Sequence, residues 1–186
     1  YFSHDSSQVW MCAQHGLYHW QRGNARPSSQ PISTTEIGQR NISNELQSCY
    51  PVETAFDVPS ENLFVSFLMS SRMGGDPNYV SCWSTRDSKS VWDKRFDDAD
   101  SVPRKLELSP DRRLLAIGLI GKASIASPQV MLVDASSGRE LHTCATSKRR
   151  GTSLCFSRDG QRIFVGSVAG DITMWDVSPA YLGLGE

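Results

Sequence analysis

The strongest constraint on the fold of this chain is a pattern that occurs four times. Each copy begins with an apolar residue and a polar turn, continues through an apolar run, and reaches a large residue after a second turn. The copies begin at Phe2, Phe56, Leu108 and Phe156, so consecutive starts lie 54, 52 and 48 positions apart. Self-similarity at a period of about 40 to 50 residues is typical of architectures that repeat one supersecondary unit. The sequence therefore predicts a repeated fold.

Within each copy the residues indicate strand, tight turn, strand, looser turn and strand. The segment Ser157–Gly160 (SRDG) has the residues that a type I turn favours, and Ser109–Arg112 (SPDR) repeats the design with proline at its second position. The strands that follow these turns, such as IFVGSV and LLAIGLI, are nearly continuous in apolar residues. Continuous apolar strands are covered on both faces of their sheet.

Further strands complete the repeated unit. Fourth strands are predicted at Lys89–Phe96, at Arg139–Ala145 and at Gln30–Ile37, and the chain stops before a fourth strand could follow Asp176. This predicts about fourteen strands. No segment shows a sustained period near 3.6, so helix is expected to be almost absent. The side chains expected in buried layers are those of Val9, Phe64, Leu115, Ile163, Trp83 and Trp175.

With this pattern the sequence resembles the WD-repeat β-propellers. The matching residues are Phe156-Ser157-x-Asp159-Gly160 with Trp175-Asp176, Leu108-Ser109-Pro110-Asp111 with Val133-Asp134, Phe2-Ser3-x-Asp5 with Trp20, and Phe56 with Trp83. The resemblance implies an all-β, WD-repeat-like propeller of about four blades that is a segment of a larger ring. The expected blades cover residues 1–48, 49–100, 101–148 and 149–186, and the last is incomplete.

The chain also departs from the family pattern. Members often carry a Gly-His pair before the first strand and an Asp in the second turn, which bond to a Ser or Thr and to the Trp. Here Arg150-Gly151 lacks the histidine and Asp171 is shifted from the usual place, although Ser167 and Trp175 remain. Only half of that network could form, so apolar packing is expected to hold the blades.

Composition narrows the classes of function. The formal net charge of -1 argues against a dedicated nucleic-acid binder. The longest apolar run, Leu114–Ile120, is far shorter than the roughly 20 residues that span a bilayer. The 5 cysteines include no Cys-x-x-Cys pair, and most lie in apolar runs, which favours free thiols in a reducing, cytoplasmic setting.

Residues that could carry chemistry are few and scattered. His15 and His19 would lie about 13 Å apart on a strand, too far for one metal ion. The acidic segment Asp97–Asp100 lacks the glycine and the terminal glutamate of a calcium loop. No nucleophile, phosphate-binding or dinucleotide motif occurs. We therefore expect no catalytic residues, cofactor or metal in this segment.

Loop length is the remaining functional signal. In the WD-repeat arrangement, the loops between second and third strands share a face with the loops that join blades. Here Ser70–Asn78 and Gly121–Gln129 are long, and Gly38–Ser48, Phe96–Ser101 and Thr146–Gly151 join blades. Length and mixed polarity on one rim indicate a partner-binding surface, with neutral loop drift as the alternative. The candidate binding residues are Arg72, Asp76, Asn78, Lys122, Lys148, Arg149 and Arg150.

Two functional hypotheses follow. The first is a non-catalytic interaction scaffold whose loop face holds a protein or peptide, completed by the remaining blades of the same propeller. The alternative is a regulatory or sensory propeller segment of a larger enzyme, such as a kinase, protease or NTPase. Fold alone does not choose between them.

Overall fold

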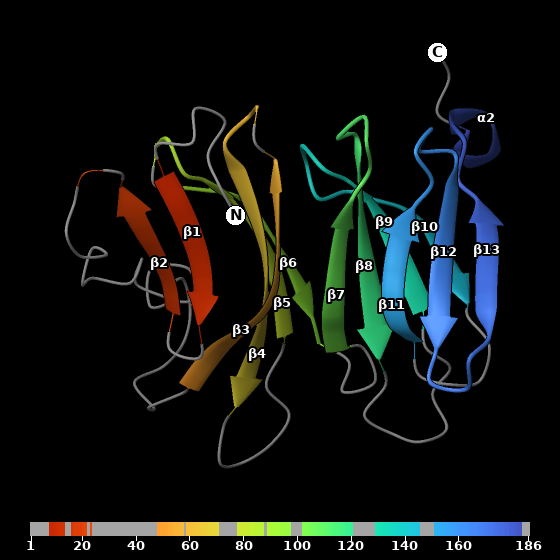
Figure 1. The fold of residues 1–186 in the computed structure, drawn as a ribbon, viewed down its shortest axis with the longest axis horizontal. Coiled ribbons are helices and arrows are strands. Elements are labelled where there is room, and N and C mark those ends of the chain that lie inside the picture. The colour runs from red at the N-terminus through yellow and green to blue at the C-terminus, as the bar shows by residue number, and fades with distance from the viewer. Residues whose placement is uncertain are drawn as a thin grey trace. The chain divides into compact units, whose positions relative to one another are not determined.

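The computed structural model describes residues 8–13, 16–21, 23, 48–57, 59–70, 78–87, 89–97, 102–120, 129–145 and 151–183. These residues form thirteen strands in four antiparallel sheets, together with one short helix (Figure 1). The chain divides into two compact units, Tyr1–Asp97 (unit 1) and Asp98–Glu186 (unit 2). None of the helical turns in the described part is long and apolar enough to cross a membrane.

Unit 1 contains two sheets. Sheet A pairs β1 (Gln8–Ala13) with β2 (Gly16–Gln21). Sheet B follows the chain in the order β3 (Ser48–Asp57), β4 (Asn62–Ser70), β5 (Asn78–Ser84) and β6 (Lys89–Phe96). Each strand pairs with its neighbour in sequence, so sheet B is an antiparallel meander, as the repeated pattern predicts.

Unit 2 contains the other two sheets. Sheet C follows the chain in the order β7 (Val102–Leu108), β8 (Leu114–Ile120), β9 (Gln129–Asp134) and β10 (Glu140–Ala145). Sheet D has three strands, β11 (Gly151–Phe156), β12 (Arg162–Ser167) and β13 (Ile172–Asp176). Helix α2 (Pro179–Leu182) follows sheet D. The fold is thus nearly all β, as expected.

The turn between the first and second strand has the same construction in sheets C and D. The amide of Arg112 donates to the carbonyl of Ser109 at 2.9 Å, and the amide of Gly160 donates to the carbonyl of Ser157 at 2.9 Å. Both closing residues have positive φ, 64° at Arg112 and 71° at Gly160. Glycine adopts this conformation without the steric cost that arginine meets. The two tight turns predicted from SPDR and SRDG are confirmed.

A second set of bonds marks the repeat in sheets B, C and D. The carbonyls of Glu61, Arg113 and Gln161 each accept the amide that follows the third strand, at 2.9, 2.9 and 2.8 Å. These three acceptors lie 52 and 48 positions apart, as Phe56, Leu108 and Phe156 do. The register inferred from the sequence therefore coincides with the register of the hydrogen bonds.

A β-bulge marks the repeat as well. The pairing of first and second strand shifts between Pro51 and Glu53, between Pro103 and Lys105, and between Gly151 and Ser153. Both prolines lie on strands at the end of their sheet order, where the missing amide costs no ladder bond. A bulge bends its strand and redirects the extra residue, which in sheet C is Arg104.

Apolar residues of neighbouring strands form the core. In unit 1, Leu63, Val65, Phe67 and Trp83 form one buried cluster. In unit 2, residues of sheets C and D together with Val177 form another, which consists of Ala116, Val130, Leu132, Cys144, Ile163, Val165 and Val177. The two sheets of unit 2 therefore pack face to face, each contributing alternate residues of its strands.

The predicted buried residues fall into this core with one partial exception. Phe64, Leu115 and Ile163 are at most 1% exposed, and Trp83 is 4% exposed. Trp175 packs against the core of unit 2 but is only partly buried. Its sheet has no strand beyond β13 among the described residues. The side chain of Val9 and the segment Gln30–Ile37, predicted as a strand, lie outside the described residues.

Candidate functional site

The structure describes one of the seven residues predicted to bind a partner. Arg72, Asp76, Lys122, Lys148, Arg149 and Arg150 lie outside the described residues. Asn78, expected in a loop, is instead the first residue of β5. It is 2% exposed and its Nδ2 has no hydrogen-bond partner. A contact between Asn78 and a partner would need the residues around it to move.

The strands that carry two of these loops are described in unit 2. Residues 121–128 connect β8 to β9, and residues 146–150 connect β10 to β11. Because the strands are antiparallel neighbours, both connections leave from the same end of sheets C and D. We call this end the loop rim of unit 2, and the opposite end the turn rim.

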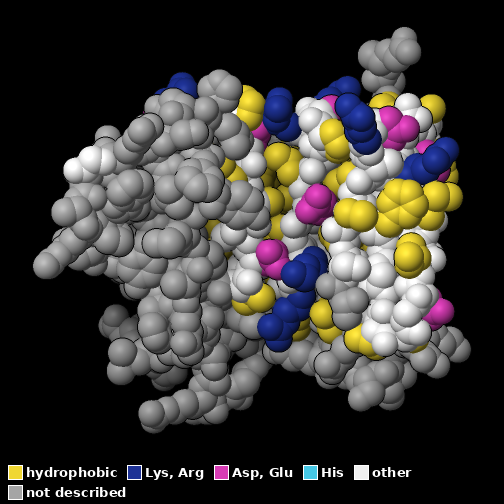
Figure 2. Space-filling model, in the orientation of Figure 1, with side chains coloured by type: hydrophobic (Ala, Val, Ile, Leu, Met, Phe, Trp, Pro, Cys, Tyr) yellow, Lys and Arg dark blue, Asp and Glu magenta, His cyan; other side chains and the backbone are white. Residues whose placement is uncertain are grey.

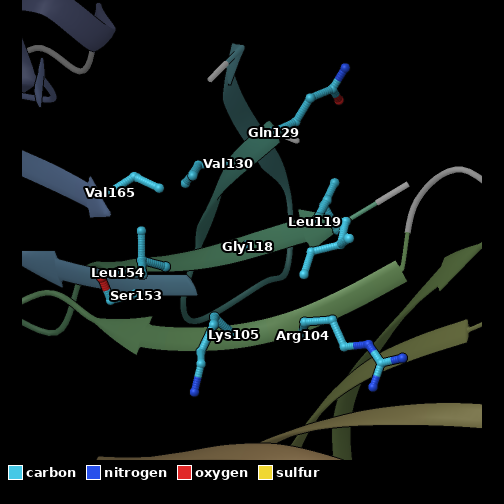
Figure 3. A pocket seen from close by; sticks show the side chains of 10 residues that line it. Arg104, Lys105, Gly118, Leu119, Gln129, Val130, Ser153, Leu154 and Val165 are labelled. Atoms are coloured by element: carbon cyan, nitrogen blue, oxygen red, sulfur yellow. The ribbon is translucent and has the colours of Figure 1, made fainter. Parts of the chain in front are cut away.

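A small pocket lies at the loop rim between sheets C and D (Figure 3). Its lining residues are Arg104, Lys105, Gly118, Leu119, Ile120, Gln129, Val130, Ser153, Leu154 and Val165. Its volume is about 20 Å³, which is close to the space that one water molecule needs. The pocket is therefore too small for a cofactor or a substrate.

The pocket has an apolar and a cationic part. Figure 3 shows Val130, Leu154 and Val165 gathered on one side, whereas Arg104 and Lys105 extend from β7 away from them. Both cationic side chains are exposed. Residues 121–128 begin directly after Ile120 and end directly before Gln129, both of which line the pocket. The predicted binding loop thus starts and finishes beside residues that line this pocket.

Local structure explains why these cations lie together at the edge. The bulge between Pro103 and Lys105 leaves Arg104 outside the ladder of β7 and β8. Gly118 is the partner of Lys105, and a Cβ at Gly118 would lie 3.1 Å from the Cβ of Lys105. The glycine permits close approach of the two strands, and the bulge redirects the arginine. Sequence reasoning missed both cations, because the bulge and the facing glycine that place them depend on the pairing of two strands.

Other chemistry is sparse in the part of the chain that the structure describes. Among these residues, no group of three or more His, Cys, Asp and Glu side chains could hold a metal ion. His142 packs edge-on against Tyr181, with ring centroids 5.8 Å apart. Burial raises the pKa of the Cys82 thiol to about 12, and the Asp57 and Asp93 carboxylates add to the rise. Burial also raises the pKa of Cys144. Neither thiol is suited to nucleophilic chemistry at neutral pH.

Comparison with known proteins identifies the fold. No protein-family model and no curated protein sequence matches this chain. Its structure is similar to a WD40 propeller chain in the crystal structure of the mitotic checkpoint complex, with a TM-score of 0.64 and 13% sequence identity. The alignment covers 94% of this chain and 46% of that one. The chain therefore has a β-propeller fold and spans less than half the length of the propeller chain that it matches.

Proposed function

We propose that this chain is a non-catalytic protein-interaction scaffold whose loop rim binds a protein or peptide partner. The observation that carries the proposal is a pair of exposed cations, Arg104 and Lys105. They line the same pocket as the residues that flank the loop of residues 121–128. Paired antiparallel sheets supply a stiff base, and binding residues are often placed on loops that such a base positions.

Charge suggests what the partner presents. All four predicted binding residues of unit 2 are cationic, namely Lys122, Lys148, Arg149 and Arg150. Together with Arg104 and Lys105 they favour an acidic segment of a partner protein. Complementary charges raise the association rate and select among partners more than they raise affinity.

A pair of charge reversals tests the proposal. Arg149→Glu with Arg150→Glu changes the loop rim, and Arg139→Glu with Arg158→Glu changes exposed residues of the turn rim by the same total charge. Both variants are expected to melt within a few degrees of the parent, because exposed substitutions usually change stability by less than about 0.5 kcal/mol. We expect the loop-rim variant alone to lose partners captured from native cell extract. Loss in the turn-rim variant alone would place the binding surface at the other rim.

The partners also include, we propose, further blades of the same propeller. The support is the outer face of sheet D, where Ile172 is 75% and Met174 is 54% exposed, and Val168 in the adjoining β12–β13 turn is 64% exposed. Figure 2 shows hydrophobic side chains at the surface over β11–β13. An apolar face of this kind marks an interaction site or an aggregation hazard. A further blade would cover this face if its own inner face resembled that of sheet D, where Ile163 and Val165 are buried.

Lysine substitutions test this second part. Ile172→Lys with Met174→Lys should leave the melting temperature of the isolated 186-residue chain nearly unchanged, because both side chains face water there. In the complete gene product the same pair should lower it by several degrees, because two charges would then be buried. An equal effect in both proteins would show that no blade covers this face.

A further inference from the structure

The last strands of sheets B, C and D differ in how their edges are protected. In sheet B the last strand, β6, carries Lys89, Asp93, Lys94 and Arg95, and in sheet C the last strand, β10, begins with Glu140. In sheet D the last strand is β13, whose sequence ITMWD has a charge only at its final residue. Charged side chains on an edge strand discourage pairing with another chain. The edge of β13 lacks this protection.

Helix α2 leads the chain away from this edge. In sheet C the chain turns back after β9, and the amide of Asp134 donates to the carbonyl of Arg139, just before β10, at 2.8 Å. In sheet D the residues after Asp176 enter α2 instead, and Tyr181 of that helix packs against His142 of β10. Figure 1 shows α2 beyond the end of β13 and not alongside it. Among the described residues, no strand therefore pairs with the second edge of β13.

The hydrogen bonds to β12 show which residues of β13 face the open edge. The amide of Val177 donates to the carbonyl of Gln161 at 2.8 Å, and the amide of Ser167 donates to the carbonyl of Asp171 at 2.9 Å. Both bonds follow the register that pairs β12 with β13. In an antiparallel ladder, residues whose amide and carbonyl point to the neighbouring strand alternate with residues whose groups point away. The odd-numbered residues of β13 therefore bond to β12.

The even-numbered residues of β13 point their amides and carbonyls to the open edge. These residues are Ile172, Met174 and Asp176. Their side chains lie on the outer face of sheet D, where Ile172 is 75% and Met174 is 54% exposed. In sheet C the matching Val130 lies opposite Cys144 of β10, and both side chains are buried. A strand at the open edge would thus contact apolar side chains and also bond to the backbone.

The sequence of β13 is complementary to itself at this edge. When a second copy runs antiparallel with Thr173 opposite its own counterpart, Ile172 of each copy lies opposite Met174 of the other. Both pairs are then hydrogen-bonded pairs, because their backbone groups point to the edge in each copy. Apolar residues directly opposite each other stabilise an antiparallel pair of strands, and so do opposed threonines. Asp176 lies opposite Gly170 in this register, so no two carboxylates are directly opposed.

We propose that the open edge of β13 binds the same edge of a second copy of this chain, so that two copies of sheet D form one antiparallel sheet. The contact is symmetric, as an interface around a two-fold axis must be. Two strands of 5 residues bury less than the roughly 1,200 Å² of a stable interface, so the association is weak and depends on concentration. The further blade proposed above would cover the outer face of sheet D and leave this edge open. The contact uses no residue of the loop rim, so its failure would leave the scaffold function untouched.

Amide hydrogen exchange of the 186-residue chain at two concentrations tests the proposal. The amides of Ile172 and Met174 should exchange about threefold or more slowly at about 1 mM protein than at about 10 μM. The amides of Thr173 and Trp175 bond to β12 and should already exchange slowly at the lower concentration. Fast exchange of Ile172 and Met174 at both concentrations would overturn the proposal. Slow exchange of both amides at both concentrations would mean that another strand of the same chain fills the edge, which overturns it as well.

Two substitutions at one position separate the edge from the face. Proline has no amide and is tolerated on edge strands, so Met174→Pro removes a donor of the open edge and no bond to β12. Met174→Ala shortens the exposed side chain and keeps the amide. In sedimentation equilibrium at about 1 mM, the parent and Met174→Ala should associate and Met174→Pro should remain a single copy.

Two results of the sedimentation experiment would contradict the proposal. A parent that remains a single copy at this concentration would exclude the contact. An equal loss of association in Met174→Ala and Met174→Pro would assign the contact to the apolar face and not to the strand edge. If Met174→Pro fails to fold, the exchange pattern of the parent decides, because only edge pairing slows the even-numbered amides selectively.

Discussion

Sheets C and D are built on the same pattern, yet one is enclosed and the other is open. Val130 and Ile172 occupy matching positions on their third strands, as do Leu132 and Met174. Val130 is 1% and Leu132 is 0% exposed, whereas Ile172 is 75% and Met174 is 54% exposed. The register is the same in both, and only the neighbour differs, because sheet D covers this face of sheet C. The repeated sequence pattern therefore specifies the strands of a sheet. Whether the side chains on the outer face of that sheet are buried depends on the sheet that packs against it.

The largest expected difference is between the matching apolar residues. Leu132→Ala should lower the free energy of unfolding by about 2 to 5 kcal/mol, because it leaves a cavity in a closed core. Met174→Ala should lower it by less than about 0.5 kcal/mol, because the side chain is already in water. Urea unfolding of the two variants measures both values. Similar losses would mean that the outer face of sheet D is covered in solution.

A smaller difference is expected in the turns, where two serines make the same bonds. Ser109 Oγ accepts the amide of Leu114 at 2.9 Å in a buried setting, and Ser157 Oγ accepts the amide of Arg162 at 3.0 Å in an exposed one. Ser109→Ala should cost about 1 to 3 kcal/mol, because a buried amide loses its partner. Ser157→Ala should cost about 0.5 kcal/mol, because water replaces the hydroxyl.

Thermal or urea unfolding of the two serine variants gives the comparison directly. Ser109→Thr is the control, because it keeps the hydroxyl and changes volume only slightly. If Ser157→Ala proves as costly as Ser109→Ala, then local turn geometry, and not burial, determines the contribution of this bond.

The smallest expected effect concerns pH. The Ser136 hydroxyl, together with the Ser137 hydroxyl and both amides, lowers the pKa of Asp134. A lowered pKa in the folded state means that the charge stabilises the fold above the unfolded pKa of about 4, and that this contribution is lost as pH falls through the folded value. Asp134→Asn should therefore cost less than about 0.5 kcal/mol near pH 7 and nothing near pH 2, because the turn is largely exposed.

Unfolding free energies of the parent and Asp134→Asn across this pH range measure the effect. A difference in the free energy of unfolding that persists near pH 2 would show that the asparagine changes the turn geometry and that the lost charge is not the cause. Asp176, the matching residue of sheet D, accepts the amide of Ser178 at 2.9 Å, and the Ser178 hydroxyl, then this amide, lower the pKa of its carboxylate. Because Asp176 is more exposed than Asp134, Asp176→Asn should change the free energy of unfolding less than Asp134→Asn does.

Much of the fold could be predicted from the sequence because the pattern is local. The turn SPDR determines where β7 ends and β8 begins. The turn SRDG does the same for β11 and β12. The predicted fourth strand Lys89–Phe96 coincides with β6. These features depend on neighbours in the chain, so residue type and spacing carry the information.

Other features depend on residues far apart in the chain, and the sequence did not reveal them. The cationic edge at Arg104 and Lys105 arises from a bulge together with Gly118 on the next strand. At the turn rim of unit 2, Asp111, Asp159 and Leu182 of α2 line one pocket of about 150 Å³, and their separation in the sequence hides this arrangement. The partner-binding loops remain predictions, since six of their seven chosen residues lie outside the described part.

The meander of strands has a further consequence for how unit 2 opens. Each strand pairs with the next strand in the chain, and sheets C and D join mainly through one apolar cluster. In such arrays, cooperativity comes from contacts between adjacent repeats. Amides of sheet D should therefore exchange with solvent through partial opening that leaves sheet C intact. A neighbour that docks on the exposed face of sheet D would slow hydrogen exchange throughout that sheet.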